Sequence, residues 1–284
     1  MNRFGVTSSV LDLKRVMVRT PAVSGDWRMA GWRVPDGPTL LAQHEVFVQV
    51  LLDLGCEVDI APAVEGMVDA VYMYDSAFVI GSGAVLLHSP KPSRQGEAHM
   101  AEEALIQAGV PIVGRLTGSA RCDGGDLMWL EDGTLIAGRT YRTNAAAHEQ
   151  LKALIEADGH QFLRADMPHD KGPDVCLHLM SVVSPVRADL AVVFEPLSPT
   201  PLLEALTTRD VSWISIDADE YELMGTNVLA VRPGVVIMID GLPKTRRALE
   251  AAGVEVHVYD GSHLSHKGDG GPTCLTRPLW RAVS

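Results

Sequence analysis

The sequence has few cysteines, and nothing in their spacing pairs them. Four occur among 284 residues, with neither the pattern of a disulfide framework nor that of a CxxC metal site: Cys56, Cys122, Cys176 and Cys274. Residues 1–5 are followed by polar residues rather than by an apolar stretch, so we expect no secretory signal. These features predict a reduced, cytoplasmic protein with free thiols.

Long apolar runs and a surplus of basic residues are also lacking. No apolar run approaches the roughly 20 residues that a membrane-spanning helix needs. The 24 Lys and Arg residues are outnumbered by 36 Asp and Glu residues, which gives a formal net charge of −12. An acidic chain without a basic patch argues against a nucleic-acid surface. We therefore expect no membrane and no nucleic acid as a partner. P-loop, GxGxxG and HExxH motifs are absent too.

The length suits one large domain over residues 1–284, and four stretches of it share one pattern. Each stretch predicts a strand, a tight turn, a second strand, a helix and a third strand. The predicted strand pairs lie at 77–80 and 84–87, 127–130 and 134–137, 177–183 and 190–194, and 228–231 and 235–239. The predicted helices are 97–108, 145–157, 200–207 and 244–252, with third strands at 110–113, 161–163, 211–216 and 254–258.

A divergent fifth copy opens the chain, with a strand at 15–19, a helix at 40–54 and a strand at 57–60. Glycines 55, 109, 159 and 253 stand where a helix needs a left-handed residue at its C-terminal end. Five such units predict an α/β ring with sheets inside, helices outside and an axial channel at which the first strands converge. The alternative is an open α/β sandwich.

Cys274 is the strongest candidate for a nucleophile. It follows the glycine-rich turn 268–271, which leaves little side-chain bulk around the thiol and brings backbone N–H groups close to it. With a histidine and carboxylates elsewhere in the chain, this pattern is typical of nucleophilic catalysis. The alternative is a loop cysteine without a role.

Polar residues open the other repeats. His178 lies at the start of the third, on a predicted strand that places His178 and Met180 on one face and Leu177, Leu179 and Ser181 on the other. Asp75 opens the first repeat, and Asp123 and Asp126 flank a glycine pair at the start of the second. These carboxylates are suited to bind a cationic group or to orient His178. We expect all of them at the same mouth as Cys274.

Two further features of the sequence are weaker indications of function. His263 and His266, or Cys176 beside His178, suggest a metal site, but the spacing of a metal motif is missing and we expect none. The segment 24–37, with two tryptophans and two arginines between Gly and Pro residues, is either a lid over the channel or an ordinary surface loop.

Six segments together resemble the superfamily of amidinotransferases, dimethylarginine dimethylaminohydrolases and arginine deiminases, the penteins: 75–79, 93–97, 124–126, 142–144, 178–181 and 270–274. The resemblance runs from about Arg15 to Pro278. It implies a five-bladed ββαβ propeller, Cys274 as the nucleophile, and His178 as the general acid and base. It also implies that Asp75 holds the substrate and that Arg94 and Arg142 contact its carboxylate end.

Two features differ from the pattern of the guanidine-cleaving members. Ile80 and Gly81 stand where acidic residues are expected to bind the guanidinium, and Asp123 replaces a glutamate. A guanidinium needs carboxylate partners, because burying an unpaired cation is costly. The difference therefore suggests a less basic substrate, such as a ureido compound or a substituted amidine.

The sequence accordingly predicts a cofactor-independent hydrolase of non-peptide C–N bonds, acting on a small guanidino or ureido amino acid and similar to dimethylargininase. Cys274, His178 and Asp123 are the predicted catalytic residues, and Asp75, Arg94, Asp126 and Arg142 bind the substrate. Two alternatives stay open: an amidinotransferase with the same Cys–His chemistry, and a non-catalytic pentein that binds a macromolecule. The oligomeric state is open as well, with a homodimer among the alternatives.

Overall fold

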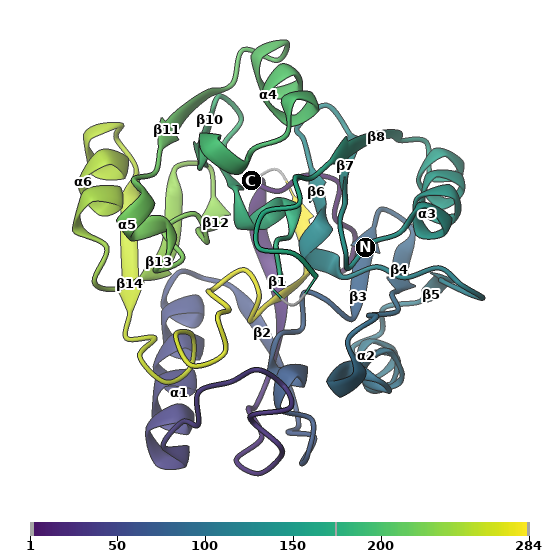
Figure 1. The fold of residues 1–284 in the computed structure, drawn as a ribbon, viewed down its shortest axis with the longest axis vertical. Helices are drawn as coiled ribbons and strands as arrows, with labels where there is room; N and C mark the ends of the chain where they lie inside the picture. The colour runs from purple at the N-terminus through teal and green to yellow at the C-terminus, as the bar shows by residue number, and fades with distance from the viewer. Residues whose placement is uncertain (1–2, 174, 283–284) are drawn as a thin grey trace.

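The described residues form five three-stranded sheets around a common axis (Figure 1). The computed structural model describes residues 3–173 and 175–282, so the outermost ends of the predicted domain, residues 1–2 and 283–284, lie outside the described residues. The sheets confirm the predicted ring and exclude the open sandwich. They also confirm the predicted five-bladed ββαβ propeller.

Four of these sheets repeat one arrangement. Two strands form an antiparallel hairpin, and a third strand pairs in parallel with the second strand of that hairpin. The strands are β3 (Ala77–Ile80), β4 (Gly83–Leu86) and β5 (Ile112–Arg115); β6 (Leu127–Trp129), β7 (Thr134–Arg139) and β8 (Gln161–Asp166); β9 (Val183–Arg187), β10 (Leu190–Val193) and β11 (Ser212–Ser215); and β12 (Leu229–Arg232), β13 (Val235–Ile239) and β14 (Glu255–Tyr259).

Helices cover the outside of the ring (Figure 1). Each of five helices connects the second strand of a sheet to the third: α1 (Gly37–Asp53), α2 (Glu97–Gln107), α3 (Ala145–Ala157), α4 (Thr200–Thr207) and α6 (Pro243–Ala251). A sixth, short helix, α5 (Ala218–Tyr221), follows β11. The long helices bury one apolar stripe each, as Leu40, Phe47 and Leu51 of α1 do. None of the described helices is long and apolar enough to span a membrane.

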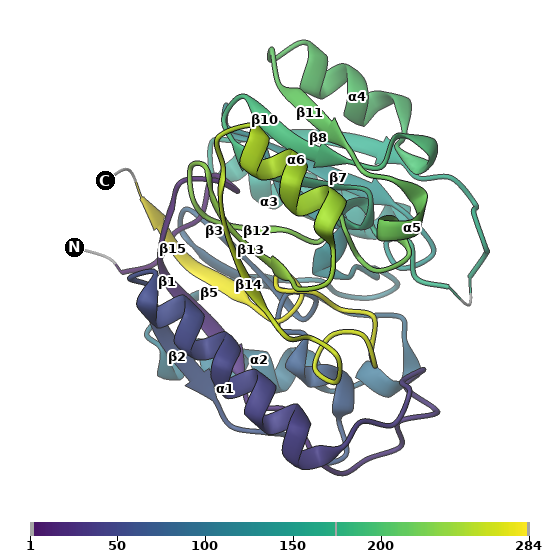
Figure 2. The same cartoon turned by 90° about the vertical axis from the view of Figure 1, so that its left-hand side faces the viewer.

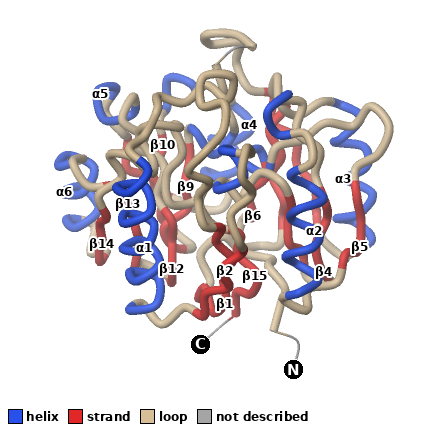
Figure 3. Tube along the Cα trace, turned by 90° about the horizontal axis from the view of Figure 1, so that it is seen from below, coloured by secondary structure: helices blue, strands red, loops and turns tan. Residues whose placement is uncertain are grey.

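The fifth sheet joins the two ends of the chain. β15 (Arg277–Ala282) pairs antiparallel with β1 (Asp12–Arg19), and β1 pairs in parallel with β2 (Glu57–Ala61). The predicted divergent copy therefore receives its missing first strand from the C-terminal end of the chain. The described ends of the chain consequently lie together at one end of the ring, where Gly5 and Arg281 are hydrogen-bonded through their backbones (Figures 2 and 3). Cys274 lies three residues before β15, toward the other end of that strand.

The third repeat differs from its prediction. β9 begins at Val183, whereas the segment before it forms a loop and a 3₁₀ turn over Leu179–Ser181. Side chains take up the backbone groups here: Ser181 Oγ accepts the His178 N–H at 3.1 Å, and Asp126 Oδ1 accepts the Leu179 N–H at 2.9 Å. The predicted alternation of side chains from 177 to 181 is therefore wrong, because a strand ladder does not bind this segment.

Below the mouth, side chains fill the axis of the ring. The cavity that remains there has a volume of about 20 Å³ and is lined among others by Tyr74, Met180, Thr273 and Arg277. The Arg277 guanidinium lies 4.0 Å from the centre of the Tyr74 ring and donates to the carbonyls of Tyr74 and Ala77. The axial channel therefore narrows to the size of a water molecule beneath the mouth.

The helix-ending glycines give a test of the fold. Gly253 has φ 78°, and no atom lies within 4 Å of the place of an added Cβ. We expect Gly253→Ala to lower the free energy of unfolding by roughly 1–2 kcal/mol through backbone strain alone. Asn tolerates the left-handed region better, so Gly253→Asn should lose less. Urea unfolding measures both variants, and equal losses for Ala and Asn would contradict the strain argument.

Candidate active site

The predicted site residues stand just before the first strands of their sheets. Asp75 precedes β3, Asp126 precedes β6, His178 precedes β9 and Cys274 precedes β15. Because these strands run in the same sense around the axis, the segments before them meet at one end of the ring. Hydrogen bonds between the segments confirm that they lie together, since Tyr74 N–H donates to the Cys274 carbonyl at 3.2 Å.

His178 and Asp123 form the central pair. Their Nε2 and Oδ2 atoms are 3.2 Å apart, and Arg142 Nη1 lies 3.3 Å from the same carboxylate oxygen. Asp123 is 1% exposed, and its other oxygen, Oδ1, has no hydrogen-bond partner among the described residues. Burial alone would raise the pKa of Asp123, but the hydrogen bond and charge of His178 outweigh it and hold that pKa at about 2. Asp123 is thus an anion with one free acceptor oxygen.

His178 is held as a cation. Burial alone would lower its pKa, but Cys176, Asp126, Asp123 and Asp75 together raise it well above the usual value. Cys176 Sγ lies 3.2 Å from His178 Nε2, on the exposed side of the ring. At neutral pH the imidazolium is therefore the resting form, which suits a general acid.

Asp75 is supported from two sides. Its Oδ1 accepts the Gly125 N–H at 2.8 Å, and its Oδ2 lies 2.7 Å from Arg94 Nη1. Arg94 itself is buried, with Glu97 at 3.7 Å and the Asp69 carbonyl at 3.4 Å. The guanidinium of Arg94 is therefore engaged by protein groups around it and holds Asp75 in place.

Asp126 is engaged entirely by the protein. Its Oδ2 accepts the hydroxyls of Thr140 at 2.7 Å and Thr143 at 2.5 Å, and its Oδ1 accepts the Leu179 N–H. The residue is 0% exposed, and burial raises its pKa to about 6. This geometry makes Asp126 a support for the segment that carries His178.

Cys274 is partly buried, and its sulfur receives a hydrogen bond from Asn227 Nδ2 at 3.1 Å. Burial raises the pKa of the Cys274 thiol to about 11, and Asp75 acts in the same direction. Asn227, His178 and the backbone of Gly271 act against this rise. The thiol is therefore neutral in the resting site, and a bound cation would be needed to favour its thiolate.

Ile80 and Gly81 do not lie at the mouth of the ring. Ile80 is buried at the far end of β3, and Gly81 stands in the turn after it, where its N–H donates to Asp158. The carboxylates of the mouth are instead Asp75 and Asp123. The expectation that Ile80 and Gly81 occupy guanidinium-binding positions is therefore wrong, since the hairpin carries them away from Cys274.

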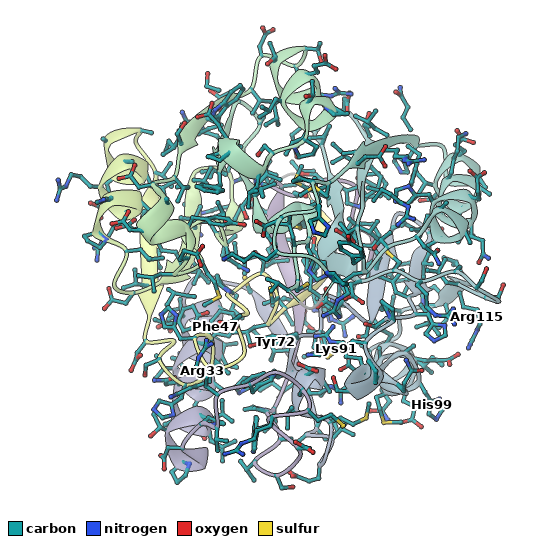
Figure 4. The ribbon with its side chains drawn as sticks, viewed as in Figure 1. Arg33, Phe47, Tyr72, Lys91, His99 and Arg115 are labelled. Carbon is teal, nitrogen blue, oxygen red and sulfur yellow. The ribbon has the colours of Figure 1, made fainter. Side chains whose placement is uncertain are left out.

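The segment 24–37 packs beside the turn that precedes Cys274. Trp32 stacks on Tyr72 with ring centres 5.3 Å apart and donates to Asp69 at 2.9 Å. Arg33 donates to the His266 carbonyl, and Lys91 Nζ lies 2.6 Å from the Ala30 carbonyl. Figure 4 shows Tyr72 and Lys91 toward the centre of the ring, whereas His99 and Arg115 lie at its rim. The segment is docked here, and its role as a lid stays a prediction.

The side chain of His263 has a protein partner. His263 Nδ1 accepts the Asp36 N–H at 2.8 Å. Within residues 3–173 and 175–282, no group of three or more His, Cys, Asp or Glu side chains is arranged to hold a metal ion.

Sequence reasoning missed three neighbours of the site. Asn227 contacts the Cys274 sulfur, the Cys176 sulfur contacts His178, and the buried Tyr72 hydroxyl has no partner among the described residues. The sequence did contain a signal for Asn227. This residue directly precedes the predicted strand 228–231, at the place where other repeats carry their site residues. The sequence contained no such signal for Tyr72, because the position of its side chain depends on packing against segment 24–37.

Comparisons with known proteins agree with this fold. The family model described as arginine deiminase matches residues 211–281. The dimethylarginine dimethylaminohydrolase of Pseudomonas aeruginosa is 24% identical, over 93% of this chain and 98% of that protein. The arginine deiminase of Rhodococcus erythropolis is 26% identical over 77% of this chain, which covers 61% of that protein's length. A solved structure of a dimethylarginine dimethylaminohydrolase adduct is 25% identical, with a TM-score of 0.78 over 94% of this chain and 99% of the other.

The ring of five ββαβ units is the propeller fold of the pentein class, which the solved structure shares. In sequence and in fold, the chain is similar to the dimethylarginine dimethylaminohydrolases and arginine deiminases of the pentein superfamily.

The His178–Asp123 pair gives a direct test of the electrostatics. Asp123→Asn removes the negative charge 3.2 Å from Nε2, so the imidazolium loses its hydrogen-bonded anion. We expect the pKa of His178 to fall by about one unit or more, as measured by NMR titration of labelled histidine. Asp132→Asn, a change in a distant turn, serves as the control. An unchanged His178 titration in Asp123→Asn would contradict the pairing.

Proposed function

We propose that the chain hydrolyses a C–N bond of a guanidino compound through a covalent intermediate on Cys274. The observation that carries this proposal is the hydrogen-bonded His178–Asp123 pair at the mouth where Cys274 lies. The superfamily supports it, since relatives are named arginine deiminase and dimethylarginine dimethylaminohydrolase. An arginine- or dimethylarginine-like amino acid is the first substrate to consider.

The carboxylates at the mouth favour a guanidinium over a ureido group. Asp75 and Asp123 are both buried, and Asp123 Oδ1 is an acceptor without a partner among the described residues. A planar cation with several N–H donors suits two such carboxylates. Of the departures that argued for a less basic substrate, Ile80 and Gly81 lie outside the site, and Asp123 still presents a carboxylate at the mouth.

Arg142 is the better placed of the two predicted carboxylate contacts. Its side chain is 16% exposed beside Asp123, whereas the Arg94 side chain is 4% exposed and bonded to Asp75. We therefore infer that Arg142 contacts the carboxylate end of the substrate, while Arg94 orients Asp75.

The first half of the reaction forms the covalent bond. A guanidinium bound between Asp75 and Asp123 stabilises the Cys274 thiolate, whose lost proton passes to solvent. The sulfur attacks the guanidino carbon and gives a tetrahedral intermediate. The C–N bond then breaks as the His178 imidazolium donates its proton to the leaving ammonia or amine, which leaves an amidino group on sulfur.

The second half releases the product. Neutral His178 takes a proton from a water molecule, whose oxygen attacks the amidino carbon. The C–S bond breaks, and the product leaves as a ureido compound with Cys274 regenerated. Asp123 stabilises the imidazolium that forms again on His178. The cycle consumes one water molecule and requires no cofactor.

Turnover of a substrate panel tests the reaction. Arginine, dimethylarginine, agmatine and citrulline are incubated with the protein, and released amines and ammonia are read by mass spectrometry. We expect a guanidino compound to react and Cys274→Ala to lose at least about 10³-fold in rate, because the nucleophile is gone. Unchanged turnover in Cys274→Ala would contradict the mechanism, and a product that requires an added acceptor amine would favour an amidinotransferase.

The covalent intermediate has a test of its own. The turnover mixture is quenched in acid, and the intact protein and its peptides are weighed. We expect an amidino adduct on the peptide that carries Cys274, because release waits for water activation by His178. An adduct on Cys176 in place of Cys274 would contradict the assignment. The homodimer and the cytoplasmic location stay predictions.

A further inference from the structure

Asn227 occupies the mouth position of the one repeat for which the sequence offered no site residue. The other sheets contribute Asp75, Asp123, His178 and Cys274 from the segments before their first strands. Asn227 precedes β12, the first strand of the remaining sheet, by two residues. Its position in the ring therefore corresponds to that of the predicted catalytic and binding groups.

The orientation of the Asn227 amide is fixed by its partners. Its Oδ1 accepts the backbone N–H of Thr273 at 3.0 Å, and a backbone N–H is only a donor. The carbonyl oxygen of the amide must therefore face Thr273, which leaves the NH₂ group facing the Cys274 sulfur at 3.1 Å. The amide thus bridges the backbone of the turn and the sulfur atom that the turn presents.

Gly271 makes this approach feasible. A Cβ at position 271 would lie 2.5 Å from Asn227 Cγ, closer than carbon atoms pack. The backbone of Gly271 also hydrogen-bonds to Cys274 and lowers its thiol pKa, as does the Asn227 amide. Two uncharged donors therefore converge on the sulfur in a site where burial and Asp75 oppose its ionisation.

We propose that Asn227 is a catalytic residue that holds the Cys274 sulfur and stabilises its thiolate through a charge-assisted N–H···S bond. This role rests on the proposed function, in which Cys274 is the nucleophile. A hydrogen bond to an ion is about twice as strong as a neutral one, so the donor favours the thiolate over the thiol. The attack on the guanidino carbon then starts from a positioned sulfur.

The variant Asn227→Asp separates the two functions of the amide. A carboxylate keeps an oxygen for the Thr273 N–H but replaces the donor to sulfur with an anion. The readout is alkylation of Cys274 by iodoacetamide from pH 7 to 10, followed on its own peptide by mass spectrometry so that Cys176 does not interfere. Below the thiol pKa, this rate follows the thiolate fraction.

We expect Asn227→Asp to slow alkylation of Cys274 by about tenfold or more at pH 8, with a smaller loss for Asn227→Ala. Asn144→Asp is the matched control, because Asn144 bonds backbone groups at the start of α3 and should leave the profile unchanged. Should the Asp variant not fold, Asn227→Ala and Asn227→Ser carry the test, and each must still slow alkylation.

An unchanged alkylation profile in folded Asn227 variants would overturn the proposal. The assay needs no substrate, so its outcome is independent of the reaction class. Slower alkylation in a protein that turns over no guanidino compound would leave Asn227 as a thiolate-stabilising residue and reject the proposed function. Normal alkylation with normal turnover would show that Asn227 serves the turn alone and would reject this inference.

Discussion

The pairing of β15 with β1 is the constraint on which the rest of the structure depends. Met17 lies opposite Arg277 in this ladder, so the last strand of the chain becomes the first strand of the sheet that opens it. Ring closure places Cys274, three residues before β15, at the mouth that Asp75, Asp123 and His178 reach from other sheets. A chain that left this pair unformed would keep four sheets and lose the nucleophile from the site, and it would expose two sheet edges.

The charged groups at the mouth are buried, and their protonation states depend on one another. Arg94 lies beside Asp75, and Arg142 and His178 lie beside Asp123 and hold its pKa low. Asp126 is instead held by hydroxyls and a backbone N–H. Burial and Asp75 disfavour a thiolate at Cys274, so the resting site combines a neutral thiol with a histidine cation. A bound guanidinium would change this balance, which ties formation of the nucleophile to the presence of its substrate.

Local signals predicted most of the fold. Turn glycines and apolar periodicity located four repeats, because these depend on neighbours in sequence. The partner of β1 lies more than 250 residues away, and no local pattern shows such a pairing. The 3₁₀ turn after His178 depends on Asp126, a tertiary contact. Repeat positions and motifs predicted which residues would meet at the mouth. Ile80 and Gly81 were misplaced, because only the register of the β3–β4 hairpin shows that they lie at the far end of β3.

The central claim is that water attacks a carbon held on the Cys274 sulfur. Its most direct test is turnover of the reactive guanidino compound in water enriched in oxygen-18, with the product weighed by mass spectrometry. The account predicts one oxygen-18 atom in each molecule of ureido product and none in the remaining substrate. A product without the label, or one formed equally well by Cys274→Ala, would contradict it.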